Sequence, residues 1–174
     1  LGVTGTNGKS TTCSMIYQAA RAVGIRAGLI GTLATAMDGE EVGSVRTTPE
    51  APDLFRTIAR MKDGGVKLIV MEVSSIALSE HRVNGVEFDC VGFTNLSHDH
   101  LDYHDSMVEY FSAKSQLFSQ RFARSALICT DSSWGMKLSK SIAIPFESVG
   151  NVGSPDWKIT ENHDGGSWLL RGPK

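Results

Sequence analysis

The sequence predicts an α/β fold: a doubly wound, mostly parallel sheet with a phosphate-binding loop, plus a small antiparallel hairpin near the C-terminus. Short apolar runs alternate with helix-like segments, which is the pattern of βαβ units. Two of these runs, 68–71 and 90–93, are continuously apolar, as expected of parallel strands that are covered on both faces. A glycine-rich segment directly follows the first run and leads into a helix-like segment.

The apolar runs give the predicted strands, and a helix-like segment from Met15 to Val23 separates the first two. Asp38-Gly39, which lies between Leu33 and Arg46, predicts a hairpin turn, because both residues accept the positive φ angles that such turns need. The five runs assigned as strands are Leu1 to Thr4, Ala27 to Leu33, Leu68 to Val73, Cys90 to Leu96 and Ala126 to Thr130.

Two further segments carry boundary signals. A helix is predicted from Thr48, which can act as its N-cap, with Pro49 at the first helical position and Gly64-Gly65 as the stop. Near the C-terminus, Trp157 to Thr160 and Ser167 to Arg171 flank turn-forming residues, which predicts an antiparallel hairpin beside the main sheet.

Composition and charge exclude several classes of protein. With 174 residues, of which 41% are hydrophobic, the chain is long enough for one domain with a buried core. A net charge of -2 gives no general attraction to nucleic acid or to anionic membranes. No apolar run approaches the ~20 residues that cross a bilayer, and the N-terminus lacks the order of a signal peptide. We therefore expect a cytoplasmic protein, and a monomer.

The cysteines do not indicate a disulfide framework or a zinc site. Cys13, Cys90 and Cys129 are odd in number and widely spaced, without a C-x-x-C pair. We expect all three to be small buried hydrophobic residues.

The segment 2–12, GVTGTNGKSTT, is the strongest functional signal. Its glycines let backbone N–H groups curl around phosphate oxygens, and the helix that follows adds the partial positive charge of its N-terminus. Lys9 can then reach the outer phosphates, and Ser10 can bind Mg²⁺. The match to the P-loop pattern is imperfect, because Val3 stands at the first glycine position. The alternative is a glycine-rich turn that only caps a helix.

Polar residues follow three of the predicted strands, at the edge of the sheet where ligands bind in α/β proteins. The first strand leads to the phosphate loop, the third to the segment 72–75 and the fourth to the segment 95–100. Glu72 is placed like an acidic residue that helps to hold Mg²⁺ opposite a phosphate loop. Alternatively, it is an ordinary solvated carboxylate at a strand end.

Three histidines and two aspartates form a dense cluster in the sequence. The cluster could bind metal, position a nucleophile or only decorate a polar loop. Its spacing is close to the H-x-H-x-D-H metal motif of metallo-β-lactamase-like hydrolases, but the last histidine comes one residue late. The residues are His98, Asp99, His100, Asp102 and His104.

Lys114 lies in the apolar stripe of a predicted helix. That helix begins at Ser106, where Glu109 completes a capping box, and is expected to continue to about Phe122. Because burying an unpaired ammonium is costly, Lys114 must reach out to solvent, lose its proton, find an anion or be chemically modified.

Together these residues resemble the Mur ligases, and in particular the branch that adds the third residue of the peptidoglycan stem peptide. The resemblance covers most of residues 1–122. It implies a ligase that uses ATP and Mg²⁺ to join an amino acid to UDP-MurNAc-L-Ala-D-Glu through an acyl phosphate. The segments that carry it are 2–12, 47–50, 71–75, 81–83, 88–89, 94–97, 99–104 and 113–114.

The resemblance also implies roles for single residues. Lys9, His100 and Lys114 would be catalytic, and Lys114 matches a lysine that is carbamylated in this family, which would turn a cation into an anionic metal ligand. The residues implied for each ligand are Gly5, Thr6, Asn7, Gly8, Lys9, Ser10 and Thr11 for ATP, Ser10, Glu72, His100 and carbamylated Lys114 for Mg²⁺, and Thr47, Thr48, Ser74 and Arg82 for the UDP-MurNAc-dipeptide.

The sequence departs from the family pattern at three positions. Ile76 stands where this branch usually has a histidine, His98 replaces an arginine, and Asp105 replaces a glycine. These departures bear on the acyl phosphate and on loop geometry, and not on the ATP site.

We expect residues 1–174 to form an incomplete central ATP-binding domain, without the family's N-terminal UDP-binding and C-terminal amino-acid-binding domains, and to be inactive or nearly so alone. The region that selects the amino acid is not recognised, so its identity is not predicted. The alternatives are a kinase or another NTPase with a phosphate loop, a folylpolyglutamate or cyanophycin synthetase, and a fragment that binds nucleotide without catalysis.

Overall fold

The computed structural model describes residues 1–43, 46–99, 102–161 and 167–173. Most strands in these ranges are short, as the alternating pattern predicts. Their bounds are β1 (Gly2–Thr4), β2 (Ala27–Ile30), β3 (Ala34–Met37), β4 (Glu40–Gly43), β5 (Leu68–Glu72), β6 (Val91–Phe93), β7 (Ala126–Cys129), β8 (Phe146–Gly150), β9 (Trp157–Glu161) and β10 (Trp168–Arg171).

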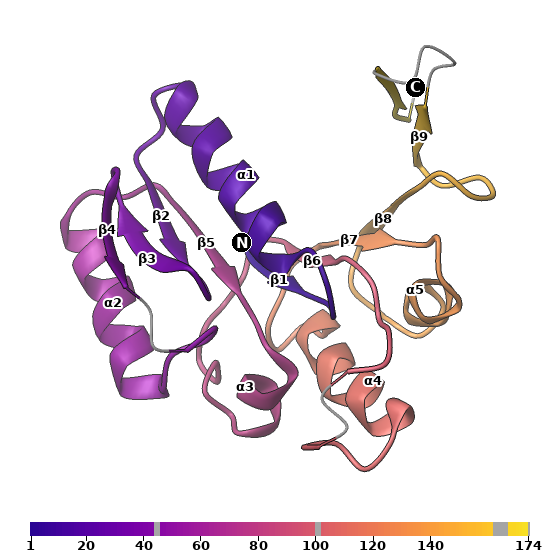
Figure 1. The fold of residues 1–174 in the computed structure, drawn as a ribbon, viewed down its shortest axis with the longest axis horizontal. Helices are drawn as coiled ribbons and strands as arrows, with labels where there is room; N and C mark the ends of the chain where they lie inside the picture. The colour runs from indigo at the N-terminus through magenta and orange to yellow at the C-terminus, as the bar shows by residue number, and fades with distance from the viewer. Residues whose placement is uncertain (44–45, 100–101, 162–166, 174) are drawn as a thin grey trace.

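These strands form one sheet in the order β10-β9-β8-β7-β6-β1-β5-β2-β3-β4 (Figure 1). The six central pairs, β9-β8, β8-β7, β7-β6, β6-β1, β1-β5 and β5-β2, are parallel. The pairs at the two ends of the sheet, β2-β3, β3-β4 and β9-β10, are antiparallel. The predicted α/β class and the mostly parallel sheet are therefore confirmed.

Helices cover the two faces of the sheet unequally. Helix α1 packs against β1, β2 and β5 on one face, and the other α-helices contribute to a larger core on the opposite face. Neighbouring strand residues divide between the two cores, because successive side chains point to opposite faces: Val70 joins the core under α1 and Met71 joins the other. The helices are α1 (Lys9–Ala22), α2 (Ala51–Asp63), α3 (Ser75–Ser79), α4 (Met107–Ser115) and α5 (Ser133–Ser139), with a 3₁₀ turn η1 (Gln116–Phe118) after α4.

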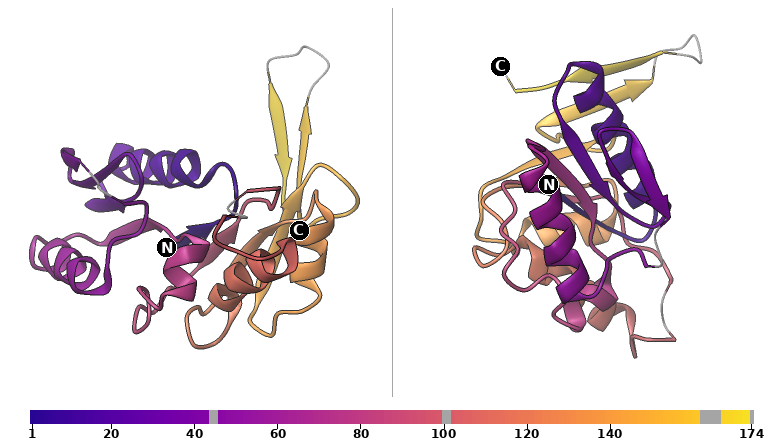
Figure 2. Two further views of the ribbon diagram at one scale, coloured as in Figure 1. Left: turned by 60° about the horizontal axis from the view of Figure 1, so that its bottom comes forward. Right: turned by 90° about the vertical axis from the view of Figure 1, so that its left-hand side faces the viewer.

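Both predicted hairpins are present. Asp38 and Gly39 have φ angles of 51° and 101°, so they form the two-residue turn between β3 and β4. The C-terminal hairpin of β9 and β10 continues the sheet through two residue pairs between β8 and β9, and it extends away from the rest of the molecule (Figure 2). The predicted antiparallel hairpin is thus confirmed, and it lies at the edge of the sheet next to β8.

Several predicted boundaries are wrong. Thr48 does not cap α2: the helix begins at Ala51 with Glu50 as N-cap and Pro52 in its first turn, because the Thr48 hydroxyl bonds to the end of β5 instead. The helix that starts after Ser106 ends as α4 and η1, and does not reach Phe122. Strands β2 and β6 end three residues early, and the residues beyond them enter the loops at the carboxyl edge.

Smaller elements and two of the cysteines also differ from expectation. The sequence analysis did not assign α3, α5 or β8. Cys13 is buried as predicted, whereas Cys90 and Cys129 are partly exposed. Within the described ranges, each helix is too short or too polar to traverse a bilayer.

Candidate active site

The loop between β1 and α1 takes a shape that depends on glycine. Gly5 and Gly8 have φ angles of 146° and 85°, which L side chains rarely adopt. A Cβ atom on Gly5 would lie 1.9 Å from Thr94 Oγ1. Only a residue without a side chain therefore lets the loop pass this close to the end of β6. Gly8 is the N-cap of α1, and the first turn of α1 contains no acidic residue. The loop therefore presents a positive helix end, as the phosphate-loop prediction requires.

Residues after β6 hold the loop in place. Asn95 accepts a hydrogen bond from Asn7 N and donates one to Asn7 O, each at 3.0 Å. Thr94 Oγ1 donates to Asn7 O at 2.7 Å, and Thr6 N donates to Asn95 O at 2.9 Å. Thr6 Oγ1 accepts from Ser97 N at 3.0 Å and lies 3.2 Å from the Tyr110 hydroxyl on α4. The ends of β1 and β6 and helix α4 thus form one bonded unit.

Two lysines converge on this loop. Lys9 Nζ donates to Gly5 O and Thr6 O, each at 2.9 Å, and Lys114 Nζ donates to the same Gly5 oxygen at 2.9 Å. Lys114 is 1% exposed and lies 4.6 Å from the centre of the Tyr110 ring, so its predicted burial is confirmed and it does not reach out to solvent. Burial, aided by the nearby Lys9 charge, lowers the pKa of Lys114 to about 7. Burial also lowers the pKa of Lys9, against the opposing attraction of Glu72 and Asp99.

Glu72 ends β5 as a buried carboxylate, 2% exposed. Ser10 Oγ donates to its Oε2 at 2.9 Å, and Thr32 donates through N to Oε1 at 2.8 Å and through Oγ1 to Oε2 at 3.1 Å. The alternative of a solvated strand-end carboxylate is therefore wrong. Oxygen donors of this kind suit Mg²⁺, and the three hydrogen-bond donors are neutral, so Ser10 and Glu72 fit a divalent cation.

The four residues implied for the acceptor substrate lie together beside Glu72. Thr48 Oγ1 donates to Glu72 O at 2.9 Å and accepts from Ser74 N at 3.1 Å. Thr47 Oγ1 lies 3.0 Å from Thr32 Oγ1. Arg82 is buried and donates through Nη1 to Thr48 O at 3.2 Å. The N-termini of α2 and α3 and the ends of β2 and β5 therefore meet at one place.

A cavity of about 380 Å³ opens between these elements. Among the described residues that line it none is acidic, so the cavity suits an anionic ligand. Its cationic residues are Lys9, Arg46, Arg82 and Lys114. Its other lining residues are Thr32, Thr47, Thr48, Ser74, Ser75 and Ile76.

The histidines do not act as one cluster in the part of the chain that is described. His100 lies outside the described residues. His98 is exposed, whereas His104 is buried, with Nε2 3.0 Å from Ser75 Oγ and its ring against Tyr110. Within the described ranges, no three side chains of His, Cys, Asp or Glu gather as metal ligands. The hydrolase motif includes His100, so that alternative stays untested.

The sequence analysis missed three contributors to the site. Thr32 holds Glu72, Tyr110 contacts both Thr6 and Lys114, and Arg46 lines the cavity. For Thr32 the sequence offered one signal: it lies just after a predicted strand core, and residues that follow the strands at this edge of the sheet form the binding site in α/β proteins. Tyr110 was assigned only to the apolar stripe of its helix.

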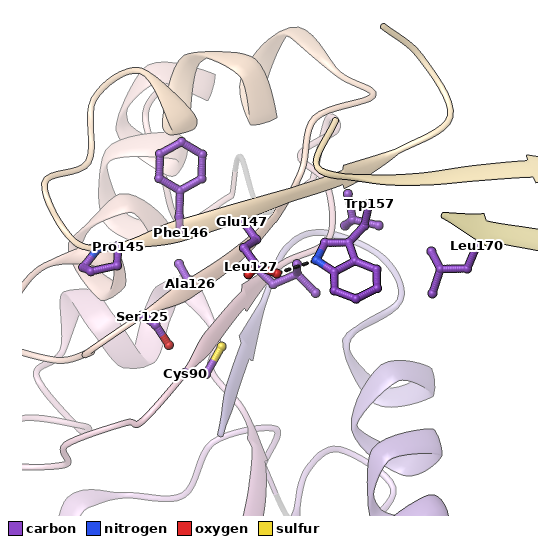
Figure 3. Close-up of a pocket in the computed structure, with 10 residues that line it drawn as sticks. Cys90, Ser125, Ala126, Leu127, Pro145, Phe146, Glu147, Trp157 and Leu170 are labelled. Atoms are coloured by element: carbon purple, nitrogen blue, oxygen red, sulfur yellow. Dashed lines mark hydrogen bonds between the residues drawn. The ribbon is translucent and has the colours of Figure 1, made fainter. Parts of the chain in front are cut away.

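A larger hollow, about 570 Å³, lies elsewhere on the molecule (Figure 3). It is lined near the starts of β6, β7 and β8, away from the carboxyl edge where the phosphate loop lies. Trp157 Nε1 donates to Glu147 across it. The remaining lining is mostly apolar and includes Leu127, Phe146 and Leu170. This apolar groove offers no convergent cations and is not the candidate active site.

Comparisons with known proteins agree with this geometry. Residues 3–168 match the family model described as the Mur ligase middle domain. UDP-N-acetylmuramyl-tripeptide synthetase of Leifsonia xyli subsp. xyli is 44% identical over 161 residues, which are 91% of this chain and 31% of that relative. UDP-N-acetylmuramoyl-L-alanyl-D-glutamate--2,6-diaminopimelate ligase of Corynebacterium glutamicum is 48% identical over 165 residues, 92% of this chain and 32% of the relative.

Solved structures give the same picture. A structure of UDP-N-acetylmuramoyl-L-alanyl-D-glutamate--2,6-diaminopimelate ligase has a TM-score of 0.82 and 26% identity, covering 92% of this chain and 34% of that one. Folylpolyglutamate synthases reach TM-scores of 0.66 to 0.69 at 14–18% identity, which shows a shared fold alone. The chain spans about a third of the length of its relatives.

Proposed function

The chain belongs to the Mur ligase family, as its middle domain, and from this premise we propose that it is the ATP-binding centre of a ligase that adds the third amino acid to UDP-MurNAc-L-Ala-D-Glu. The observation that carries the proposal is the cavity in which two lysines that contact the phosphate loop and a second group of cations line the same space. A phosphate donor and an acidic acceptor can meet there.

The proposed reaction has two steps. A carboxylate oxygen of the acceptor attacks the γ-phosphorus of ATP, the bond to the β-phosphate oxygen breaks, and ADP leaves. The amino group of the incoming amino acid then attacks the acyl carbon, phosphate leaves with the electrons of the broken C–O bond, and the nitrogen loses a proton. The chain would contribute mainly positioning and charge neutralisation.

Lys9 and the loop backbone would hold the phosphates, with Lys9 exchanging its two carbonyl partners for phosphate oxygens. Ser10 and Glu72 would hold Mg²⁺, which neutralises phosphate charge when bound. The Glu72 carboxylate also orients Thr32 at the wall of the cavity. A role for His100 stays a prediction.

Carbamylation of Lys114 is part of the proposal. A pKa near 7 leaves a large share of the amine neutral at physiological pH, and only the neutral amine can add to CO₂. The carbamate would be an anionic oxygen ligand beside the phosphate loop. An intact mass measured with bicarbonate present should show one added carboxylate, and the Lys114→Met variant should lack it.

The central test measures ADP formation by the full-length protein with ATP, Mg²⁺, UDP-MurNAc-L-Ala-D-Glu and an amino acid. The names of the relatives make 2,6-diaminopimelate the first amino acid to test. We expect continued ADP formation, beyond one ADP per enzyme molecule, only when both acceptor and amino acid are present, and little or none from residues 1–174 alone. ADP formation with a folate acceptor instead would contradict the proposal. Cytoplasmic residence and the monomeric state stay predictions.

A further inference from the structure

Two adjacent serines line the cavity, and different parts of the chain hold their hydroxyl groups. Ser74 is the N-cap of α3, and its Oγ accepts from Ala77 N at 3.1 Å. Ser75 is the first residue of α3, and its Oγ lies 3.0 Å from Nε2 of His104, which precedes α4. The Ser74 hydroxyl therefore belongs to the end of the helix, whereas the Ser75 hydroxyl is held by a side chain from another segment.

His104 is itself fixed between aromatic rings. It is 1% exposed, and the centre of its ring lies 4.9 Å from that of Tyr103 and 5.1 Å from that of Tyr110. Tyr110 in turn lies on α4 and contacts Thr6 of the phosphate loop. Because its neighbours restrict the imidazole, His104 sets the direction of the Ser75 hydroxyl.

The fold does not need this polar pair. Ser75 is 1% exposed, like His104, so two polar side chains are removed from water at the wall of the cavity. A buried hydrogen bond adds little net stability, and apolar residues of the same shape could replace such a pair at small cost. The place of the pair at the cavity wall therefore indicates a role in the site.

The charge of the cavity decides the direction of the hydrogen bond between Ser75 and His104. Four cations and, among the described residues, no acidic side chain line the cavity, so its ligand is anionic and needs donors. A serine has one O–H, which is free for a ligand only when its Oγ accepts from the histidine. In that tautomer His104 Nε2 carries the proton and donates to Ser75 Oγ, and the Ser75 O–H is left for the ligand.

The second step of the proposed reaction creates a charge that such a donor can stabilise. When the amine nitrogen attacks the acyl carbon, the C–N bond forms and the carbonyl electrons move onto oxygen, which becomes an oxyanion. The C–O bond to phosphate then breaks, the carbonyl forms again, and the departing phosphate takes the proton that nitrogen loses. A hydroxyl aimed at the oxyanion stabilises the transition state more than it stabilises the acyl phosphate.

We propose that the Ser75 hydroxyl donates a hydrogen bond to this oxyanion, and that His104 is the positioning residue that aims the hydroxyl. This inference rests on the proposed function, because it concerns amide formation in the same cavity. Lys114 lines that cavity too, and its Nζ lies 4.6 Å from the centre of the Tyr110 ring, against which His104 packs. Ser75 is thus held by the packed group that borders the phosphate loop, where the acyl phosphate would form.

The experiment follows the two steps separately in the full-length enzyme. Rapid mixing with ATP, Mg²⁺ and UDP-MurNAc-L-Ala-D-Glu reports the first ADP, and later addition of 2,6-diaminopimelate reports the rate of amide formation. S75A should form the first ADP within about twofold of the wild-type rate and the amide about 10²-fold more slowly, because one oxyanion donor is lost. A purely structural role of Ser75 would slow both steps alike.

Variants of the histidine test the positioning role. H104Q keeps a side-chain N–H donor, so it should form the amide within about fivefold of wild type, whereas H104L should lose as much as S75A. The double variant S75A/H104L should be no slower than S75A, because His104 acts through Ser75. If H104L does not fold, S75A and H104Q decide the proposal.

S79A is the matched control for S75A. Ser79 ends the same helix and is not among the residues that line the cavity. Both steps should therefore keep their wild-type rates in S79A.

The outcomes separate the two hypotheses. No ADP from wild type with acceptor and amino acid overturns the proposed function, whatever the serine does. An active wild type in which S75A does not slow the second step more than the first overturns the inference and leaves the ligase function standing. Losses that add in S75A/H104L, or a loss in H104Q as large as in S75A, overturn the role given to His104.

Discussion

The molecule has two hollows built on opposite principles. The cavity at the carboxyl edge of the sheet is lined by four cations and five hydroxyl side chains, and its residues bond to partners far away in the sequence. The apolar groove near the starts of β6 to β8 is larger and mostly apolar (Figure 3). If volume alone decided which hollow is the candidate active site, it would be the groove. The charge, burial and convergence of the side chains indicate the cavity instead.

The comparison also teaches where stability comes from. Buried Lys114 and Glu72 are costly for the fold, and nothing in the core requires their charge. The groove residues are ordinary contributors to packing. Replacing cavity residues should therefore remove activity at little or no cost in stability, and replacing groove residues should do the reverse.

The largest expected effect is on activity in the cavity. Lys9→Ala should reduce kcat/KM for ADP formation by about 10²–10³-fold, because a cation aimed at the transferring phosphate is lost. The free energy of unfolding should change little, as Lys9 bonds to loop carbonyls at the edge of the fold. A variant that retains a third or more of wild-type activity would contradict the role of Lys9.

The next effect is on stability, and it depends on pH. Lys114 has a folded pKa of about 7, below its unfolded value, so between pH 7 and 9 the unfolded chain holds a proton that the folded chain lacks. Stability should therefore rise with pH in this window, by roughly 2–3 kcal/mol from Lys114 alone, and fall to its lowest level below pH 7.

Lys114→Met should flatten that rise, as measured by urea unfolding of residues 1–174 at several pH values in carbonate-free buffer. The lowered pKa of the N-terminus affects both proteins alike, so the difference reports on Lys114 together with its interaction with Lys9. Parallel stability curves for the two proteins would show that burial does not hold the lysine pKa down.

A smaller effect is expected from the groove. Trp157 lies against Gly172, where an added Cβ would come within 2.5 Å of its ring, and it donates to Glu147. Trp157→Ala should cost about 1–2 kcal/mol of unfolding free energy through lost packing. ADP formation by the full-length enzyme should stay within about twofold of wild type, below the loss seen on removing a catalytic donor. A tenfold loss of activity in Trp157→Ala would show that the groove contributes to activity as well as to stability.

The smallest effect concerns a single bond beside the cavity. Tyr110→Phe removes the contact of the hydroxyl with Thr6 Oγ1 while the ring over Lys114 remains. It should cost about 1 kcal/mol of stability and raise the KM for ATP severalfold. Tyr103→Phe is the control, since Tyr103 is 42% exposed. Equal effects of the two changes would show that the bond does not position the loop.

The features that the sequence predicted correctly depend on local order along the chain. The glycine-rich loop between β1 and α1, the strand that ends at Glu72 and the stripe around Lys114 are each contained in about three helical turns or one strand. Because parallel strands end at one edge, these local segments were also expected to meet, and Lys9, Ser10 and Glu72 do so.

The features that it predicted wrongly or missed depend on distant partners. In the sequence, Thr48 has the features of an N-cap. In the structure, its hydroxyl donates instead to the backbone oxygen of Glu72, 24 residues later at the end of β5. His104 looks like part of a polar loop, but it is buried against Ser75, 29 residues before it. Arg46 is an unremarkable surface arginine in sequence, and only the cavity reveals that it shares Glu50 with Arg82.

The carbonyl oxygens that Lys9 contacts have a consequence for turnover. Gly5 O and Thr6 O offer the Lys9 ammonium two bonds of 2.9 Å whenever phosphate oxygens do not. Under the proposed function, departure of ADP would let these two bonds form again, so Lys9 would keep hydrogen-bond partners in the empty site. The loop carbonyls would then compete with the product for Lys9, which would favour the exchange of ADP for ATP.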